Sequence, residues 1–135
     1  MVDTASAYLP STRYEGTYRC EPAQVRFVRS ALADVLGGCD RADDVILVAS
    51  ELAANAAVHS WGDSFTVRCE VHHGYVWVEV EDRGGLWLTR QRDARPHRFD
   101  VVHALAGEDN WGVDGGPAGW VAWARLLIVP ERKAH

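Results

Sequence analysis

Apolar residues recur at helical spacing in two consecutive stretches of the N-terminal half of the chain. The first covers residues 25–36, where apolar side chains stand three or four positions apart between Pro22 and a pair of glycines. The second covers residues 45–59, which contain five alanines and no glycine or proline, and Asp40 is expected to cap it. The pattern therefore predicts two helices joined by a short turn.

Strict alternation of apolar and polar residues follows in the runs 65–71 and 75–82, which a short turn separates. Such alternation is typical of a β-hairpin with one buried face. Further strands are expected at 14–19 and 120–128, and a short helix at 99–106. This order of elements predicts an α+β fold: a two-layer α/β sandwich in which about three helices cover one face of a mostly antiparallel mixed sheet.

Composition places this fold in one domain. The 135 residues are 47% hydrophobic, and we expect a single domain over 1–135, with its core from about 20 to 128 and loose termini at 1–12 and 130–135. The net charge of −5 argues against direct binding of nucleic acid or of an anionic membrane. No apolar run approaches the roughly 20 residues that span a bilayer. Three widely spaced cysteines, with no visible signal sequence, favour a cytoplasmic protein.

Three polar residues interrupt the second helix at intervals of four: Glu51, Asn55 and His59. This spacing puts them on one stripe of the helix. In one interpretation the stripe is simply the solvent-exposed face. In the other it is the polar wall of a pocket, where Glu51 acts as a base and Asn55 offers a neutral oxygen ligand to a hard cation such as Mg²⁺.

A second unusual residue is Asp82, which ends the run 75–82. Asp82 has the same parity as the three valines of that run, so it extends the face expected to be buried. The glycines that follow, Gly84 and Gly85, allow a close approach to the backbone. Asp82 is therefore either a buried acceptor for a ligand or a turn aspartate that caps local amides.

These residues resemble the motifs of a known superfamily. The run ELAANAAVHS from Glu51 to Ser60 resembles the N-box of the Bergerat-fold, histidine-kinase-like ATPases, and the run EVEDRGG from Glu79 to Gly85 resembles their first glycine box. The segment 105–116 is similar to the anti-sigma-factor branch, whose members include stand-alone ATP-binding regulators. The similarity covers about 20 to 128. It implies the Bergerat ATP-binding fold and a regulatory protein with the serine protein kinase activity of an anti-sigma factor.

The resemblance also implies roles for individual residues. Asn55 would coordinate the Mg²⁺ ion that bridges the phosphates of ATP, and Glu51 would orient or deprotonate the attacking hydroxyl. Asp82 would accept a hydrogen bond from the adenine amino group, while Gly84 and Gly85 would let the base lie against the backbone. The implied protein partner is a small anti-anti-sigma-type protein or a sigma factor, and a homodimer is one expected assembly.

The chain departs from the family in the lid that covers the phosphates. Relatives carry a second glycine motif there, whereas this chain has PHRF at 96–99, with no glycine. Five of its 13 arginines fall within 83–98, so side chains such as Arg98 could bind phosphate in place of backbone amides. The alternative is a solvated loop.

Two further hypotheses about function follow from this departure. One is an inactive module that sequesters a protein partner, and the other is a sensor that binds nucleotide without turnover.

Overall fold

The computed structural model describes residues 12–60, 62–83, 97–116 and 118–128. Within them, five strands form one sheet in the order β1-β2-β3-β5-β4. All four pairings are antiparallel, so the sheet has no parallel pair among the described strands. The strands are β1 (Thr12–Arg19), β2 (Ser64–His72), β3 (Tyr75–Asp82), β4 (Trp111–Gly116) and β5 (Gly119–Leu127).

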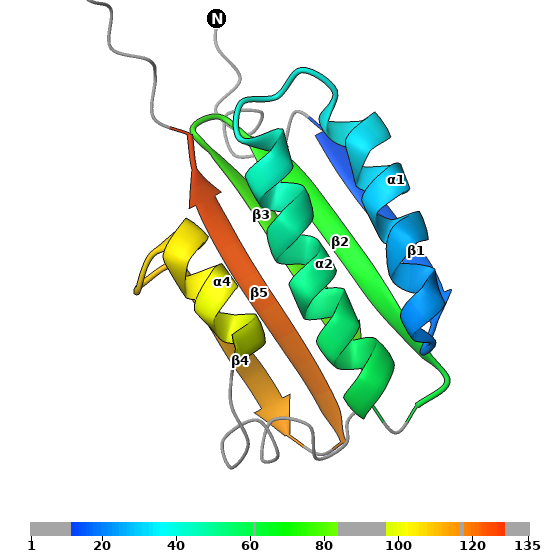
Figure 1. Ribbon diagram of the computed structural model, residues 1–135. Helices are drawn as coiled ribbons and strands as arrows, with labels where there is room; N and C mark the ends of the chain where they lie inside the picture. Colours follow the sequence, from blue (N-terminus) through cyan, green and yellow to red (C-terminus); the bar gives the residue numbers. More distant parts are fainter. Residues whose placement is uncertain (1–11, 61, 84–96, 117, 129–135) are drawn as a thin grey trace, which may run out of the picture.

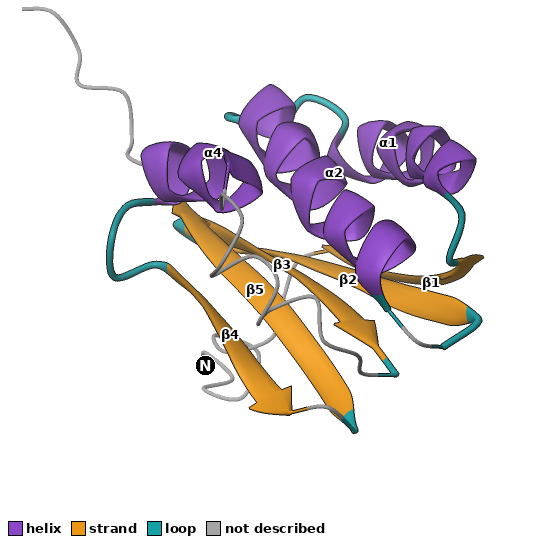
Figure 2. Cartoon of the chain, turned by 60° about the horizontal axis from the view of Figure 1, so that its bottom comes forward, coloured by secondary structure: helices purple, strands orange, loops and turns teal. Residues whose placement is uncertain are grey.

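Three α-helices cover one face of this sheet, and no other element of the described residues lies on the opposite face (Figures 1 and 2). They are α1 (Val25–Leu36), preceded by a short 3₁₀ turn, α2 (Ala42–His59) and α4 (His97–Ala106). Helix α2 lies in the middle and packs on β3, with α1 and α4 on either side (Figure 1). The predicted α+β two-layer sandwich is confirmed.

The core lies between these layers and uses the alternation seen in the sequence. The even-numbered positions of β3 and the odd-numbered positions of β2 up to Cys69 face the helices and are buried. Small side chains on both sides, such as Ala53 on α2 and Ala124 on β5, bring the helix close to the sheet. Phe65, Leu32 and Leu52 fill the remaining volume and are at most 2% exposed.

Most element boundaries agree closely with the prediction. The start of α2 differs, because contacts with segments distant in the sequence favour another N-cap residue. Helix α2 begins at Ala42, and its N-cap residue is Arg41 in a left-handed conformation (φ 65°), so the prediction that Asp40 caps this helix is wrong. The guanidinium of Arg41 donates to Asp44 Oδ2 (3.0 Å) and to the carbonyl oxygens of Leu105 (2.5 Å) and Leu127 (3.0 Å). These bonds tie α2 to the ends of α4 and β5, and they favour the unusual backbone conformation.

The ends of the chain lie largely outside the described residues. Of the segments expected to be loose, 1–12 and 130–135, only Thr12 is described, and it already pairs with Val71 in β1. Helix α4 begins two residues before the predicted range 99–106.

Candidate functional site

The stripe of polar residues on α2 faces the interior more than the solvent. Asn55 is 1% exposed, while Glu51 and His59 are partly buried. The exposed large side chains of α2 are instead apolar: Leu47 is 43% and Val58 is 49% exposed. The interpretation of the stripe as a solvent-exposed face is therefore wrong for Asn55, and the interpretation as a pocket wall fits its burial.

Asp82 lies at the inner face of the sheet. Its side chain is 4% exposed, on the same side of β3 as Val76, Val78 and Val80, as the parity in the sequence predicts. Across the sheet it pairs with Phe65 on β2 and Trp120 on β5. Asp82 thus remains within the strand, where its carboxylate faces the helices.

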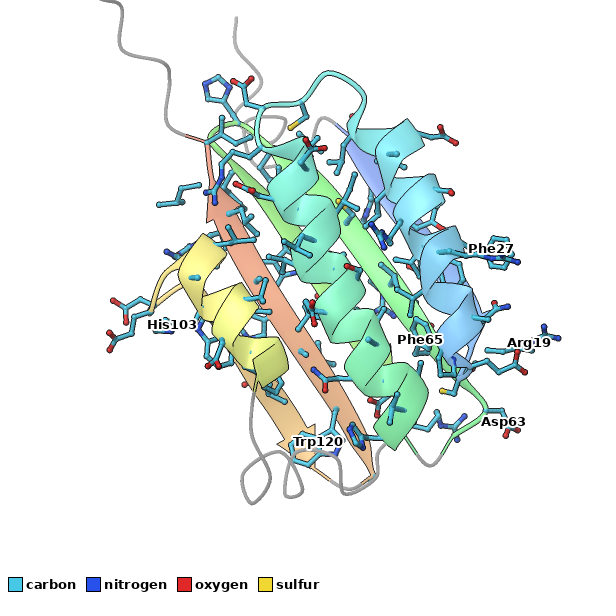
Figure 3. The ribbon with its side chains drawn as sticks, in the orientation of Figure 1. Arg19, Phe27, Asp63, Phe65, His103 and Trp120 are labelled. Atoms are coloured by element: carbon cyan, nitrogen blue, oxygen red, sulfur yellow. The ribbon has the colours of Figure 1, made fainter. Side chains whose placement is uncertain are left out.

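Asn55, in the C-terminal half of α2, and Asp82, at the end of β3, belong to the same end of the two layers. Helix α2 packs on β3, and its C-terminal half lies over the end of the sheet that carries Trp120, the neighbour of Asp82 (Figure 3). Ser60, just after α2, and Asp82 both interact with the thiol of Cys20, which follows β1. The fold therefore gathers residues from three distant segments at this end.

Cys20 and Ser60 are site residues that the sequence analysis missed. Burial raises the pKa of the Cys20 thiol, a hydrogen bond with Ser60 opposes this shift, and the nearby carboxylates of Asp82 and Asp63 add to it. The backbone amide of Cys20 also donates to the Asp63 carbonyl oxygen (2.8 Å). Ser60 ends the run that resembles the N-box but was given no role, and no motif marks Cys20, because only the pairing of β1 with β2 brings it to this position.

A polar cavity of about 450 Å³ is lined in part by Arg83, the residue after Asp82. Its lining comes from the α2–β2 connection, the residue after β3 and the β4–β5 turn: Gly62, Asp63, Ser64, Arg83 and Ala118. A Cβ atom on Gly62 would lie 2.5 Å from Cβ and Cγ of Arg83, so glycine is needed for the arginine stem to lie there.

The lid is the part of the predicted site that the structure describes least. Gly84, Gly85 and three of the five clustered arginines lie outside the described residues. Arg98 is in the first turn of α4, which begins at His97. Phe99 is 6% exposed and stacks on Trp111 at 5.2 Å between ring centroids. The position of the missing glycine motif is therefore occupied by the start of a packed helix.

The segment 105–116, which carries part of the family resemblance, forms the joint between α4 and β4. Gly107 ends the helix with φ 98°, and Asn110 Nδ2 donates to the carbonyl oxygen of Ala106 (3.1 Å). Arg125 donates twice to Asn110 Oδ1, at 3.0 and 2.8 Å. These bonds fix β4 against β5, so the described contacts of this segment are structural.

The described residues offer few groups that could bind a metal ion. Among the described residues, no group of three or more His, Cys, Asp or Glu side chains could hold a metal ion. The buried amide of Asn55 can supply one neutral oxygen, and Mg²⁺ commonly takes few protein ligands and completes its shell with phosphate oxygens and water. Within the same part of the chain, no helix is long and apolar enough to cross a membrane.

Comparison with known proteins supports the fold. No protein-family model matches the chain, and no curated protein matches it. Among solved structures, it is similar to the crystal structure of the RsbU and RsbW domains of Rv1364c from Mycobacterium tuberculosis, with a TM-score of 0.70 and 23% sequence identity. The match covers 93% of this chain and 35% of that one, so the chain spans about a third of its neighbour's length. The chain thus shares the fold of part of this structure, and that fold is the α+β sandwich that the sequence predicts.

Proposed function

We propose that the chain is an ATP-binding regulatory protein that resembles an anti-sigma factor with serine protein kinase activity. The observation that carries this proposal is the burial of Asn55 and Asp82 at one end of the two layers. A buried amide or carboxylate requires hydrogen-bond partners that replace water, so such residues are uncommon in a small core unless the site uses them. A role in binding a nucleotide accounts for both residues, and it agrees with the motifs in which they stand.

Each residue has a defined task in this proposal. Asp82 would accept a hydrogen bond from the exocyclic amino group of adenine, and the amide oxygen of Asn55 would hold a Mg²⁺ ion, which supplies positive charge to offset that of the phosphates. Glu51 lies one helical turn before Asn55 and accepts the proton of the attacking serine hydroxyl or water. The attacking oxygen bonds to the γ-phosphorus, the bond to the bridging oxygen breaks, and ADP leaves. The other substrate is a protein: an anti-anti-sigma-type partner or a sigma factor, in the cytoplasm.

Titration calorimetry with ATP and ADP, with and without Mg²⁺, tests the binding step. We expect Asp82→Asn to weaken adenine-nucleotide binding at least about tenfold, because an acceptor becomes a mixed donor and acceptor at a buried site. Glu81→Gln is the matched control, since Glu81 is the adjacent carboxylate on the opposite face of β3. Absence of binding by the unmodified chain contradicts the proposal, and equal affinity in Asp82→Asn removes Asp82 from the site.

The chemical step is tested through Glu51. Glu51→Ala should leave the affinity for ATP within about twofold and lower the rate of ADP release from ATP by about a hundredfold or more, as expected when a general base is removed. Asp43→Ala is the control, because Asp43 is an exposed carboxylate at the other end of α2. Equal turnover in Glu51→Ala would exclude this residue as the base.

A second candidate function rests on the start of α4. The packed helix at His97 replaces the glycines with which relatives cradle phosphate, and this favours a module that binds its protein partner without phosphate transfer. The same titrations separate the candidates. Binding without ADP release supports a nucleotide sensor, whereas no binding at high micromolar nucleotide supports sequestration alone.

A further inference from the structure

The neighbours of Asp82 across the sheet are aromatic on both sides. On the inner face, the side that the helices cover, Asp82 stands directly opposite Phe65 of β2 and Trp120 of β5. We propose that the indole of Trp120 is the surface on which a nucleotide base stacks, and that it makes the site selective for purines over pyrimidines. The inference rests on the nucleotide binding proposed above and adds the residue that distinguishes the two classes of base.

The side chain of Trp120 lies on the inner face. Trp120 has the same parity in β5 as Ala122, Ala124 and Leu126, which are at most 3% exposed. Residues directly opposite each other in an antiparallel pair have Cβ atoms about 4.5–5.5 Å apart, so the indole stands next to the carboxylate of Asp82. Both belong to the end of the sheet over which the C-terminal half of α2 lies (Figure 3).

The two aromatic neighbours of Asp82 differ in the surface that they leave to a ligand. Phe65 is 1% exposed and stacks on Tyr18 at 5.7 Å between ring centroids, so the core already uses its ring. Trp120 packs against the core but remains partly exposed. Of the two, Trp120 is therefore the residue whose ring has surface left for a base.

The turn between β4 and β5 keeps one flank of the indole accessible. The residue directly opposite Trp120 on β4 is Gly115, with φ 108°. A Cβ atom on Gly115 would collide with the carbonyl oxygen of Gly119, so this position excludes every side chain that could cover the indole from β4. The polar cavity described above reaches the same turn, where Ala118 is part of its lining. Space for a ligand therefore lies at the end of the sheet that carries Trp120.

Asp82 alone does not separate adenine from cytosine. Each of these bases carries an exocyclic amino group that can donate to a carboxylate, whereas guanine and thymine present a carbonyl oxygen at the corresponding position. The remaining difference is size, because the two fused rings of a purine make a larger stacking contact with an indole than the single ring of a pyrimidine. Asp82 therefore excludes bases with a carbonyl oxygen at that position, and Trp120 favours the larger of the two that remain.

Titration calorimetry with ATP and with CTP tests the proposal. We expect the unmodified chain to bind ATP more tightly than CTP, and Trp120→Ala to weaken the binding of ATP about tenfold or more, as for the loss of an aromatic side chain on which a base stacks. The affinity for CTP should fall less, so the preference for ATP should decrease. A purely structural role of Trp120 would weaken both nucleotides alike.

Trp123→Ala is the matched control. Trp123 lies three residues further along β5 on the outer face, the side of the sheet turned away from the helices, where it stacks on Trp77. This substitution removes the same side chain from the same strand and should leave both affinities within about twofold. Fluorescence gives a second measurement: ATP should quench the tryptophan emission of the unmodified chain, and Trp120→Phe should bind ATP with much less quenching.

Circular dichroism checks that each variant is folded. If Trp120→Ala does not fold, Trp120→Leu replaces it, because leucine keeps a large apolar side chain and removes the aromatic face. Absence of ATP binding by the unmodified chain contradicts the proposed function and the inference with it. If the unmodified chain binds ATP and the folded Trp120 variant keeps the same affinity and the same preference over CTP, the inference alone is overturned. An equal loss of ATP affinity in Trp123→Ala overturns it as well, because the effect then does not come from the inner face.

Discussion

Polar side chains have opposite environments on the two faces of the sheet, and β3 shows this contrast within one strand. On the inner face, Asp82 follows three valines and is 4% exposed. On the outer face, Glu79 and Glu81 share the guanidinium of Arg68 at 2.7 and 2.8 Å and remain partly in contact with solvent. A charged side chain on the outer face has little effect on the free energy of unfolding, because it is hydrated and paired. A charged side chain on the inner face loses its hydration, and this lowers the stability of the fold unless partners compensate.

This comparison has a consequence for function. A carboxylate that only stabilised the fold would be better placed on the outer face, where partners and water are available. Asp82 and Asn55 stand where the protein interior makes hydrogen bonds to a ligand stronger and more selective. The difference between the faces is therefore consistent with the nucleotide site proposed above, which uses the buried polar residues of the inner face.

The largest expected effect concerns the packing of the inner face. Phe65→Ala should lower the free energy of unfolding by about 3–5 kcal/mol, because Phe65 is 1% exposed and its loss leaves a cavity between β2 and the helices. Urea denaturation measures the change. Phe27→Ala, the same substitution at an exposed site, should cost less than about 0.5 kcal/mol. Similar losses in both variants would mean that the inner face is not the main core.

An intermediate effect on the free energy of unfolding is expected from the thiol of Cys69, which titrates on the inner face of the sheet. Burial raises the pKa of the Cys69 thiol to about 12 from its usual 9.0, so the folded state favours the protonated thiol. The stabilisation is complete below pH 9 and is lost as the pH rises from about 9 towards 12, by about 1.4 kcal/mol at pH 10.

Urea denaturation between pH 8 and pH 11, compared with Cys69→Ala, isolates this contribution. The other two cysteines also have raised pKa values and are present in both chains, so their effects cancel. If the two chains lose stability in parallel with rising pH, the thiol of Cys69 does not titrate in the core.

The smallest effect is expected on the outer face. Arg68→Met should lower the free energy of unfolding by about 1 kcal/mol or less, because the arginine is partly exposed and its ion pairs are screened by water. The three carboxylates around it would then repel one another, so the loss should shrink at high salt. Thermal unfolding at low and high salt measures it. A loss as large as that of Phe65→Ala would contradict the contrast between the two faces.

Sequence periodicity predicted most of the fold and the burial of Asp82, but not the burial of Asn55. Alternation in 75–82 placed Asp82 on the buried face, because a strand sends successive side chains to opposite sides. The same reasoning could not place Asn55: a stripe at every fourth residue is compatible with either solvent or core until the neighbours of the helix are known. The exposed side of α2 proved to carry Leu47 and Val58, which hydropathy alone would assign to the interior.

What the sequence determined by itself was local: which segments form helices and strands, which residues share a face, and the two motifs around Asn55 and Asp82. The tertiary structure decided what depends on distant neighbours. Only the order of the sheet joins Arg68 to carboxylates of β1 and β3, and only the pairing of β1 with β2 brings Cys20 to Asp82. The physical reason is that side-chain direction follows from backbone geometry within one element, whereas burial and pairing follow from packing between elements.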